Sequence, residues 1–129
     1  MEARIRAFVR ERAKHRCEYC QRRQETSPLI ALQMEDIVPI KHGGGDELDN
    51  LALACAECNL KKSSDLAGFD PETNTLTPLF HPRHDQWEDH FEWSGHRIIG
   101  LTSVGRTTVR VLDLNAAARL GIRLATGMT

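Results

Sequence analysis

The feature that most constrains this sequence is a pair of CxxC motifs. The first, "CEYC", contains Cys17 and Cys20, and the second, "CAEC", contains Cys55 and Cys58. Each CxxC turn can direct both of its sulfurs to one point, and 34 residues, 21–54, separate the two pairs. This spacing predicts one tetrahedral zinc ion bound by four thiolates. Such a site would tie the N-terminal segment to the segment that contains the second pair.

Two disulfides or a redox-active CxxC are the alternative interpretations of the four cysteines. The N-terminal stretch "MEARIRAFVRERAKHR" is amphipathic and basic, and it has no apolar signal-peptide core. No apolar run approaches the roughly 20 residues that a membrane helix needs. We therefore expect a cytoplasmic protein with no membrane segment, and a reducing compartment disfavours disulfides. A four-sulfur zinc site has no open coordination position, so we expect it to stabilise the fold and to do no chemistry.

The length and charge of the chain favour a single domain with a basic N-terminus. With 129 residues, 40% of them hydrophobic and 27% charged, the composition is that of a globular protein. Residues 1–23 contain eight Lys or Arg against three acids, and the remainder contains nine against fifteen, which gives +5 followed by −6. The basic segment could neutralise nucleic-acid phosphates, although a solvated helix face is equally compatible with it.

Hydrophobic periodicity predicts a compact series of elements in the first half of the chain. Apolar residues at helical spacing indicate a helix over 3–15, and the apolar stretch 29–40 indicates a strand with Pro39 near its end. Three consecutive glycines then predict a loop, because they allow backbone angles that are closed to other residues. A second strand at 51–54 and a short helix at 56–66 complete this part.

The second half is predicted to mix strands and helices. Residues 70–76 read as a turn between extended pieces, and residues 83–91 read as one helical stretch. A strand is expected at 96–102. Two helices are expected at 105–115 and 116–125.

Several of these motifs together resemble a known family. The chain contains, in order, "CEYC", "EDIVP", "GGG", "DNLAL" and "CAECNLKK". This series is similar to that of the HNH endonucleases with a four-cysteine zinc site, and the likeness spans about residues 6–62. The segment "DPETNTLTPLFHPRHDQWEDHFEW" also resembles the downstream region of a bacterial subgroup. The resemblance implies an α+β fold with a ββα-metal core over about 6–66 and an extension over about 67–129, all in one domain, 1–129.

The resemblance also implies a site in which two antiparallel strands and a helix hold one divalent ion on the scissile phosphate of DNA. Glu35 matches the acidic metal ligand on the first strand, and Asn59 matches the ligand on the helix. Asn50 matches the asparagine that orients the general base, and Asp36 occupies the position of that base. Lys62 matches a family lysine that could approach a phosphate. Oxygen ligands suit a hard ion such as Mg²⁺ or Mn²⁺, with Ni²⁺ as a further option.

Each of these positions also has an ordinary structural interpretation. Glu35 and Asp36 could form a polar strand edge, Asn50 could cap a turn, and Asn59 could be an ordinary residue of a helix N-terminus. Lys62 could lie on a solvated helix face. The spacing of these residues relative to the cysteines is what favours the functional interpretation.

Asp36 departs from the family pattern, which has histidine at this position. General-base catalysis contributes on the order of 100-fold to 10,000-fold, and an aspartate is a weaker base than a histidine near neutral pH. Asp36 could act as a poor base or as a second carboxylate on the ion, or His42 could substitute for the histidine. The sequence therefore predicts a metal-dependent HNH-type DNA endonuclease weakened or inactivated at Asp36. The alternative is a non-catalytic, zinc-stabilised nucleic-acid-binding or interaction domain.

Overall fold

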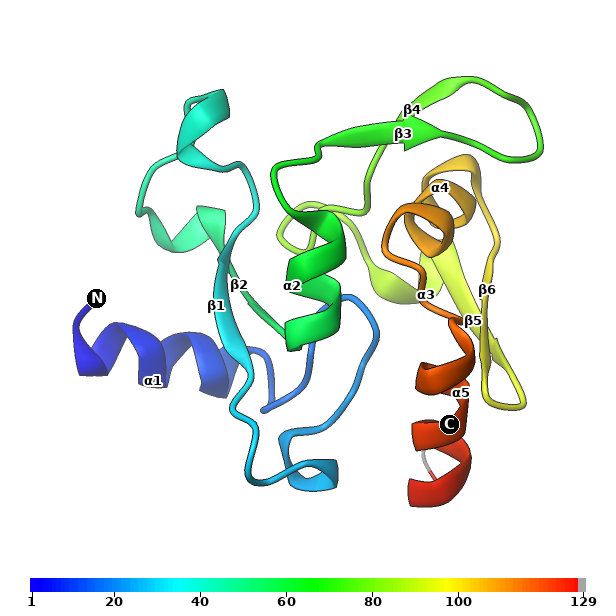
Figure 1. The fold of residues 1–129 in the computed structure, drawn as a ribbon. Coiled ribbons are helices and arrows are strands. Elements are labelled where there is room, and N and C mark those ends of the chain that lie inside the picture. Colours follow the sequence, from blue (N-terminus) through cyan, green and yellow to red (C-terminus); the bar gives the residue numbers. More distant parts are fainter. Residues whose placement is uncertain (128–129) are drawn as a thin grey trace.

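A computed structural model describes residues 1–127 of the chain (Figure 1). The N-terminal half contains helix α1 (Ala3–Arg12), strand β1 (Gln33–Asp36), strand β2 (Leu51–Ala54) and helix α2 (Ala56–Lys62). The two strands pair antiparallel, with Glu35 opposite Ala52. Helix α2 contacts β1, whereas α1 contacts β2 on the other side of the hairpin. The predicted strand, strand and helix order of the α+β core is thereby confirmed.

The first two predicted elements are shorter than the sequence pattern indicated. Helix α1 ends at Arg12 rather than at residue 15 because Lys14 and His15 have positive φ angles of 56° and 55°, which turn the chain toward Cys17. The strand predicted over 29–40 is confined to Gln33–Asp36. Its apolar beginning is not a buried strand, since Leu29 is 98% exposed.

The glycine loop between the strands is shaped by one left-handed residue and one close approach of the backbone. Gly43 has φ +91° and follows a short 3-10 helix, Ile40–His42. A Cβ on Gly44 would lie 1.6 Å from the carbonyl oxygen of Val38, so no larger residue fits there. Two further 3-10 helices, at Gln24–Thr26 and Leu48–Asn50, complete the connections of this half.

The C-terminal half contains the predicted extended pieces around 70–76 and one further short strand, Phe91–Ser94, beyond those predicted. Its elements are β3 (Ala67–Phe69), β4 (Leu76–Pro78), α3 (Trp87–His90), β5 (Phe91–Ser94), β6 (Arg97–Gly100), α4 (Ser103–Val111) and α5 (Ala117–Thr126). The predicted turn at 70–76 joins β3 to β4, which pair antiparallel.

Three predictions for this half need correction. The helix expected over 83–91 is only one turn long, because Phe91 begins β5, which pairs with β6 across a turn at Gly95. Helix α4 begins two residues before its predicted start because the Thr102 side chain accepts a hydrogen bond from Gly105 N, and it ends at Val111. Helix α5 runs from Ala117 to Thr126, one residue later than predicted at each end.

The hydrophobic core draws on both halves of the chain. One buried cluster includes Val9 and Leu53 from the N-terminal half and Phe80, Ile98 and Leu114 from the C-terminal half. This shared core is compatible with a single domain over 1–129, which stays a prediction. Within residues 1–127, no helix combines the length and the apolar character that crossing a membrane requires.

Candidate metal centres

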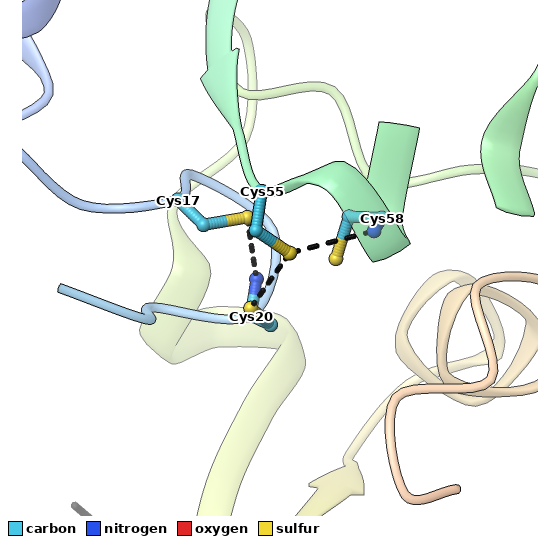
Figure 2. A group of neighbouring side chains, drawn as sticks. All are labelled: Cys17, Cys20, Cys55 and Cys58. Atoms are coloured by element: carbon cyan, nitrogen blue, oxygen red, sulfur yellow. Dashed lines mark hydrogen bonds between the residues drawn. The ribbon is translucent and has the colours of Figure 1, made fainter. Parts of the chain in front are cut away.

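The four cysteines converge on one buried point (Figure 2). Cys17 and Cys20 come from the loop after α1, and Cys55 and Cys58 come from the junction of β2 with α2. Their sulfur atoms all lie within 4.8 Å of one another, and none of the four cysteines forms a disulfide. The Sγ atoms of Cys20 and Cys55 are 3.7 Å apart. Sulfurs around a tetrahedral zinc with Zn–S distances of about 2.3 Å would lie about 3.8 Å apart.

The local backbone supports thiolates at both pairs. The backbone N–H of Cys20 donates to Cys17 Sγ, and that of Cys58 donates to Cys55 Sγ, each at 3.4 Å. Burial raises the pKa of Cys17 and Cys58 well above the ordinary value, whereas hydrogen bonds from Cys17 lower the pKa of Cys20 and of Cys55. A cation at the centre would favour the ionised form of all four thiols. This group is consistent with structural zinc.

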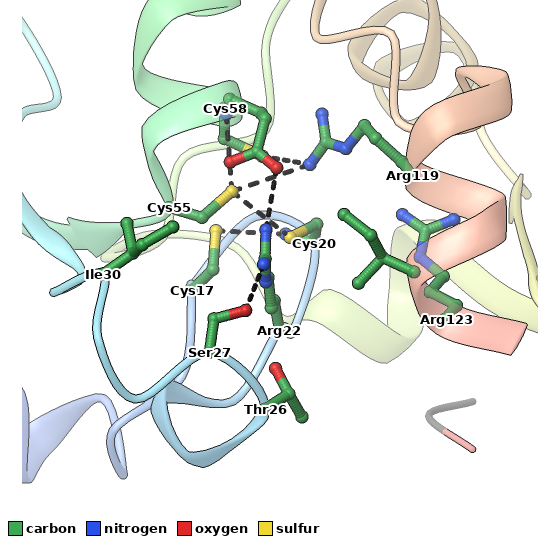
Figure 3. A network of polar contacts seen from close by, with 12 residues as sticks. Cys17, Cys20, Arg22, Thr26, Ser27, Ile30, Cys55, Cys58, Arg119 and Arg123 are labelled. Atoms are coloured by element: carbon green, nitrogen blue, oxygen red, sulfur yellow. Dashed lines mark hydrogen bonds and ion pairs between the residues drawn. The ribbon is translucent and has the colours of Figure 1, made fainter. Parts of the chain in front are cut away.

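Arg119 of α5 points toward this cluster, and Arg123 lies on the same helix beside it (Figure 3). Arg119 Nη2 donates to Cys58 Sγ at 2.9 Å, and Arg119 Nη1 donates to the carbonyl oxygen of Leu112 at 2.9 Å. Burial opposes the charge of this guanidinium, but the negative charge of Cys58 raises the pKa of Arg119 above the ordinary value. Arg123 Nη2 donates to the carbonyl oxygen of Leu114 at 2.6 Å. Through Arg119, the cysteine cluster thus connects the N-terminal half of the chain to α5.

A third arginine, Arg22, also lies beside the cluster and holds the loop around it (Figure 3). Arg22 forms an ion pair with Glu57 at 2.7 Å and donates a hydrogen bond to Ser27 Oγ. Glu57 lies in the first turn of α2 between the two cysteines of the second pair. The loop that bears the first pair is therefore fixed to the helix that bears the second.

The predicted metal ligand Glu35 lies in a closed group of polar side chains. Glu35 is 4% exposed, and its Oε2 accepts a hydrogen bond from the Tyr19 hydroxyl at 2.7 Å. Its Oε1 lies 2.7 Å from Lys62 Nζ. Burial raises the pKa of Glu35, and the charge of Lys62 opposes that rise. Burial and the charge of Glu35 raise the pKa of Tyr19 well above the ordinary value, so its hydroxyl remains a donor.

Lys62 completes this group at the C-terminal end of α2. The residue is 2% exposed, and its Nζ also donates to the carbonyl oxygen of Ile37 at 2.8 Å. Contact of Lys62 with a phosphate stays a prediction, and the buried position of its ammonium does not favour it. A buried lysine is compatible with the fold because its charge is paired with Glu35 and because it has a second hydrogen-bond acceptor.

Asp36 occupies a different environment from its neighbour. Consecutive strand residues face opposite sides, and Asp36 is partly exposed at the end of β1. Its carboxylate has no hydrogen bond or ion pair with another residue of the described chain. Burial, followed by the negative charge of Asp46, raises the pKa of Asp36 above the ordinary value, and Lys62 lowers it.

Asn50 pins the chain just after Asp36. Its Oδ1 accepts a hydrogen bond from Val38 N at 2.8 Å, and its Nδ2 donates to the carbonyl oxygens of Val38 and Gly45 at 2.9 and 2.8 Å. The backbone oxygen of Asn50 accepts from Ile37 N at 2.8 Å. These bonds join the end of β1 to the glycine loop. Asn50 therefore fixes the backbone of the segment that follows Asp36, and it does not contact the Asp36 side chain.

Asn59 lies one turn before Lys62 and on the same face of α2. Its Nδ2 donates to Gln33 Oε1 at 2.6 Å, while its Oδ1 accepts no hydrogen bond from the described residues. His42 lies in the exposed 3-10 helix after Pro39, and its ring has no hydrogen bond with the residues described. The structure thus brings Glu35, Lys62 and Asn59 to one strand and helix interface, with Asp36 on the opposite face of the strand.

Comparison with known proteins gives one match. Residues 17–65 match the family model of the HNH endonucleases. The predicted resemblance is confirmed over this HNH segment, which contains both cysteine pairs, the hairpin and α2. It supports a nuclease-type function at the level of the family. No curated protein and no solved structure matches the chain at the significance required.

Three residues around the HNH segment were not found by sequence reasoning. Tyr19, inside the first CxxC, is the hydroxyl partner of Glu35. Arg119 and Arg123, four residues apart on α5, lie beside the cysteine cluster. An arginine stripe on an amphipathic helix is an available signal, but charged helix faces are usually solvated, and the sequence does not say which helix reaches the cysteines.

Proposed function

We propose that the chain is an HNH-type endonuclease that hydrolyses phosphodiester bonds of DNA with slow turnover. The observation that carries this proposal is the position of Asp36. Its carboxylate lies at the end of β1, partly exposed and without a hydrogen bond or ion pair from the described residues, on a hairpin that Asn50 holds in place. A proton acceptor that touches water must be accessible and must have a free lone pair.

The chemistry that these residues can carry is removal of a proton from water. The water oxygen attacks phosphorus, its proton passes to Asp36, and the bond from phosphorus to the leaving oxygen of the sugar breaks. The raised pKa of Asp36 makes it a better acceptor than an ordinary aspartate. It remains a weaker base than histidine, whose ordinary pKa is about 6.5.

Glu35 and Asn59 are the residues that would hold the divalent ion of the HNH site. Asn59 fits this role because its amide oxygen accepts no hydrogen bond from residues 1–127. Glu35 does not fit as it stands, because the ammonium of Lys62 lies 2.7 Å from its Oε1, the oxygen that accepts no hydrogen bond from the described residues. The two residues therefore do not form an open pair of ligands, and the proton transfer at Asp36 is the step that the chain's own residues supply.

Plasmid cleavage by the native protein and by Asp36→His and Asp36→Asn variants tests the proposal. Each protein is incubated with Mg²⁺, Mn²⁺ or Ni²⁺. We expect slow cleavage by the native protein, faster cleavage by Asp36→His by about 100-fold or more, and none by Asp36→Asn. Native activity should fall as the pH drops through the raised pKa of Asp36, whereas that of Asp36→His should fall at a higher pH. Absence of cleavage by all three proteins with every ion would refute the nuclease proposal.

A second candidate function is DNA binding without catalysis. It is favoured by the closed Glu35 group and by four cations of the N-terminal segment, namely Arg6, Arg10, Lys14 and Arg16, whose side chains form no ion pair with the described residues. Such cations can neutralise DNA phosphates at the surface. Here the zinc-stabilised domain would bind DNA and leave it intact.

Salt-dependent binding separates the two functions. Affinity for a short DNA duplex is measured from about 50 to 200 mM salt for the native protein, a Lys14→Gln/Arg16→Gln variant and an Asn59→Ala variant. Binding that weakens with salt, weakens in the double variant and is unchanged in Asn59→Ala, together with no cleavage, would support the second candidate. Binding that does not respond to salt would contradict phosphate contact.

A further inference from the structure

Lys62 and Glu35 form the most deeply buried ion pair within the HNH segment. Lys62 Nζ lies 2.7 Å from Glu35 Oε1, and the two side chains are 2% and 3% exposed. The same ammonium donates to the carbonyl oxygen of Ile37 at 2.8 Å. The other oxygen of Glu35 accepts from Tyr19 at 2.7 Å. Tyr19 thus donates to one oxygen of Glu35, and the ammonium of Lys62 forms an ion pair at the other, Oε1, which accepts no hydrogen bond from the described residues.

The packing of α2 on β1 explains why the lysine lies there. Asn59 contacts Gln33 and Lys62 contacts Glu35, so three residues of helix correspond to two residues of strand. Three helical residues rise about 4.5 Å and two strand residues about 6.6 Å, a difference that the long lysine side chain spans. An ion shared by Glu35 and Asn59 would have to lie between these two contacts.

We infer that the ammonium of Lys62 is the resident cation of Glu35 and that it competes with any divalent ion for this carboxylate. This inference rests on the proposed function, because it concerns the ion site of that nuclease. In this chain the acid on the first strand is neutralised by the helix that follows it. A divalent ion can bind Glu35 only when the ammonium is displaced.

Displacement is unfavourable because Lys62 has no second anion within the buried group. Moving the ammonium would leave a charge in the interior beside Ile37, and burial of an unpaired charge is costly. The charge of Lys62 reaches Asp36 and lowers its pKa, but Asp36 is partly exposed on the other face of β1 and forms no ion pair with Lys62. The pair of Lys62 with Glu35 therefore opposes ion binding directly, at the carboxylate itself.

Manganese binding to the zinc-loaded full chain tests this inference. Mn²⁺ is suitable because it prefers oxygen ligands and competes poorly for thiolates, and free Mn²⁺ can be quantified by electron paramagnetic resonance. The variants are Lys62→Met, Lys62→Met/Glu35→Gln and Glu35→Gln. Lys61→Met is the matched control, because Lys61 is the exposed neighbour on the same helix.

We expect the native protein, Glu35→Gln and Lys61→Met to bind Mn²⁺ equally weakly. Lys62→Met should gain one site with an affinity higher by roughly tenfold or more, the size of a typical coupling between linked binding events. Its Tm should rise with Mn²⁺, because a ligand that binds only the folded state stabilises it. The double variant should lose both effects. A folded Lys62→Met that binds no more Mn²⁺ than the native protein would overturn the inference.

If the variants do not fold, NMR of the native protein with Mn²⁺ still tests whether Lys62 keeps the ion away from Glu35. Bound Mn²⁺ broadens the NMR signals of nearby nuclei, and the Tyr19 ring lies beside Glu35. Unchanged Tyr19 signals at Mn²⁺ concentrations up to about the millimolar range support the competition. Selective broadening of those signals at stoichiometric Mn²⁺ would overturn it. Neither readout depends on DNA cleavage, so failure of the nuclease proposal and failure of this inference are distinguishable.

Discussion

The two ends of α2 present contrasting groups of potential metal ligands. At its beginning, Cys55 and Cys58 join the first cysteine pair in a group of four sulfurs that face one another. At its end, Lys62 lies directly on Glu35. Both groups are buried, and each is contacted by a cation supplied by the chain. The cation stands outside the first group, on Arg119, and inside the second.

This difference distinguishes a ligand set built for a metal from one that is internally neutralised. Arg119 contacts the outer side of Cys58, and a thiolate can bind a metal and accept such a hydrogen bond at the same time. Four thiolates around Zn²⁺ carry a net charge of about −2, which the guanidinium partly offsets. The ammonium of Lys62 occupies the carboxylate itself. A matching motif therefore specifies ligand types, while the neighbouring cation decides whether they are available.

The largest effect is expected when the first group is broken. Cys55→Ser removes one of the four sulfurs of the cluster, and a zinc ion bound there would join the loop after α1 to α2. We expect the variant to lose its zinc and to unfold or aggregate. Metal analysis should find about one zinc per native chain and far less in the variant, and circular dichroism should report the loss of structure. A well-folded variant without zinc would show that the cysteines do not hold the fold through a metal.

The next largest loss of stability should come from breaking the Lys62–Glu35 ion pair of the second group. Removal of one member of a buried ion pair leaves the other charge unpaired and costs about 3–5 kcal/mol. Glu35→Gln and Lys62→Met should each lose about that much unfolding free energy in urea denaturation, with Lys61→Met close to the native value. The double variant should be less destabilised than the sum of the two single variants, because no lone charge remains. Strictly additive losses would contradict a direct pairing.

Sequence reasoning found the first of these groups and could not find the second. The cysteines could be assigned to one metal site from their spacing alone, because each CxxC turn directs two sulfurs to one point and a tetrahedral ion needs four ligands. The environment of Glu35 depends on the register between β1 and α2, which places Lys62 rather than Asn59 beside it. The apolar run before Gln33 indicated a long strand. Tertiary contacts decide which apolar residues are buried, however, and Leu29 remains exposed.

Arg119 should have a smaller effect that is confined to the first group. Arg119→Gln removes the charge beside Cys58 and one hydrogen bond to Leu112. Outer-shell partners of metal ligands typically contribute about 10-fold to 100-fold in metal affinity, so we expect the variant to lose zinc to a chelator that much more readily. Arg119→Lys should release zinc at a rate between those of the native protein and Arg119→Gln, because lysine keeps the charge but lacks the planar guanidinium. Arg97→Gln, an exposed arginine on β6, serves as the control and should release zinc like the native protein.

The smallest effect is expected for Asn59, the partner of Glu35 in the predicted ion site. Asn59→Ala removes one hydrogen bond to Gln33 on a partly exposed surface, a loss of about 0.5–1.5 kcal/mol. If Lys62 is the resident cation of Glu35, the native protein and Asn59→Ala should have the same small response of Tm to Mn²⁺. In a Lys62→Met background, the same substitution should weaken the Mn²⁺ response, because the amide oxygen then becomes an ion ligand. A clear loss of Mn²⁺ stabilisation on introducing Asn59→Ala into the native protein would mean that the second group also holds an ion, and the contrast between the two ends of α2 would disappear.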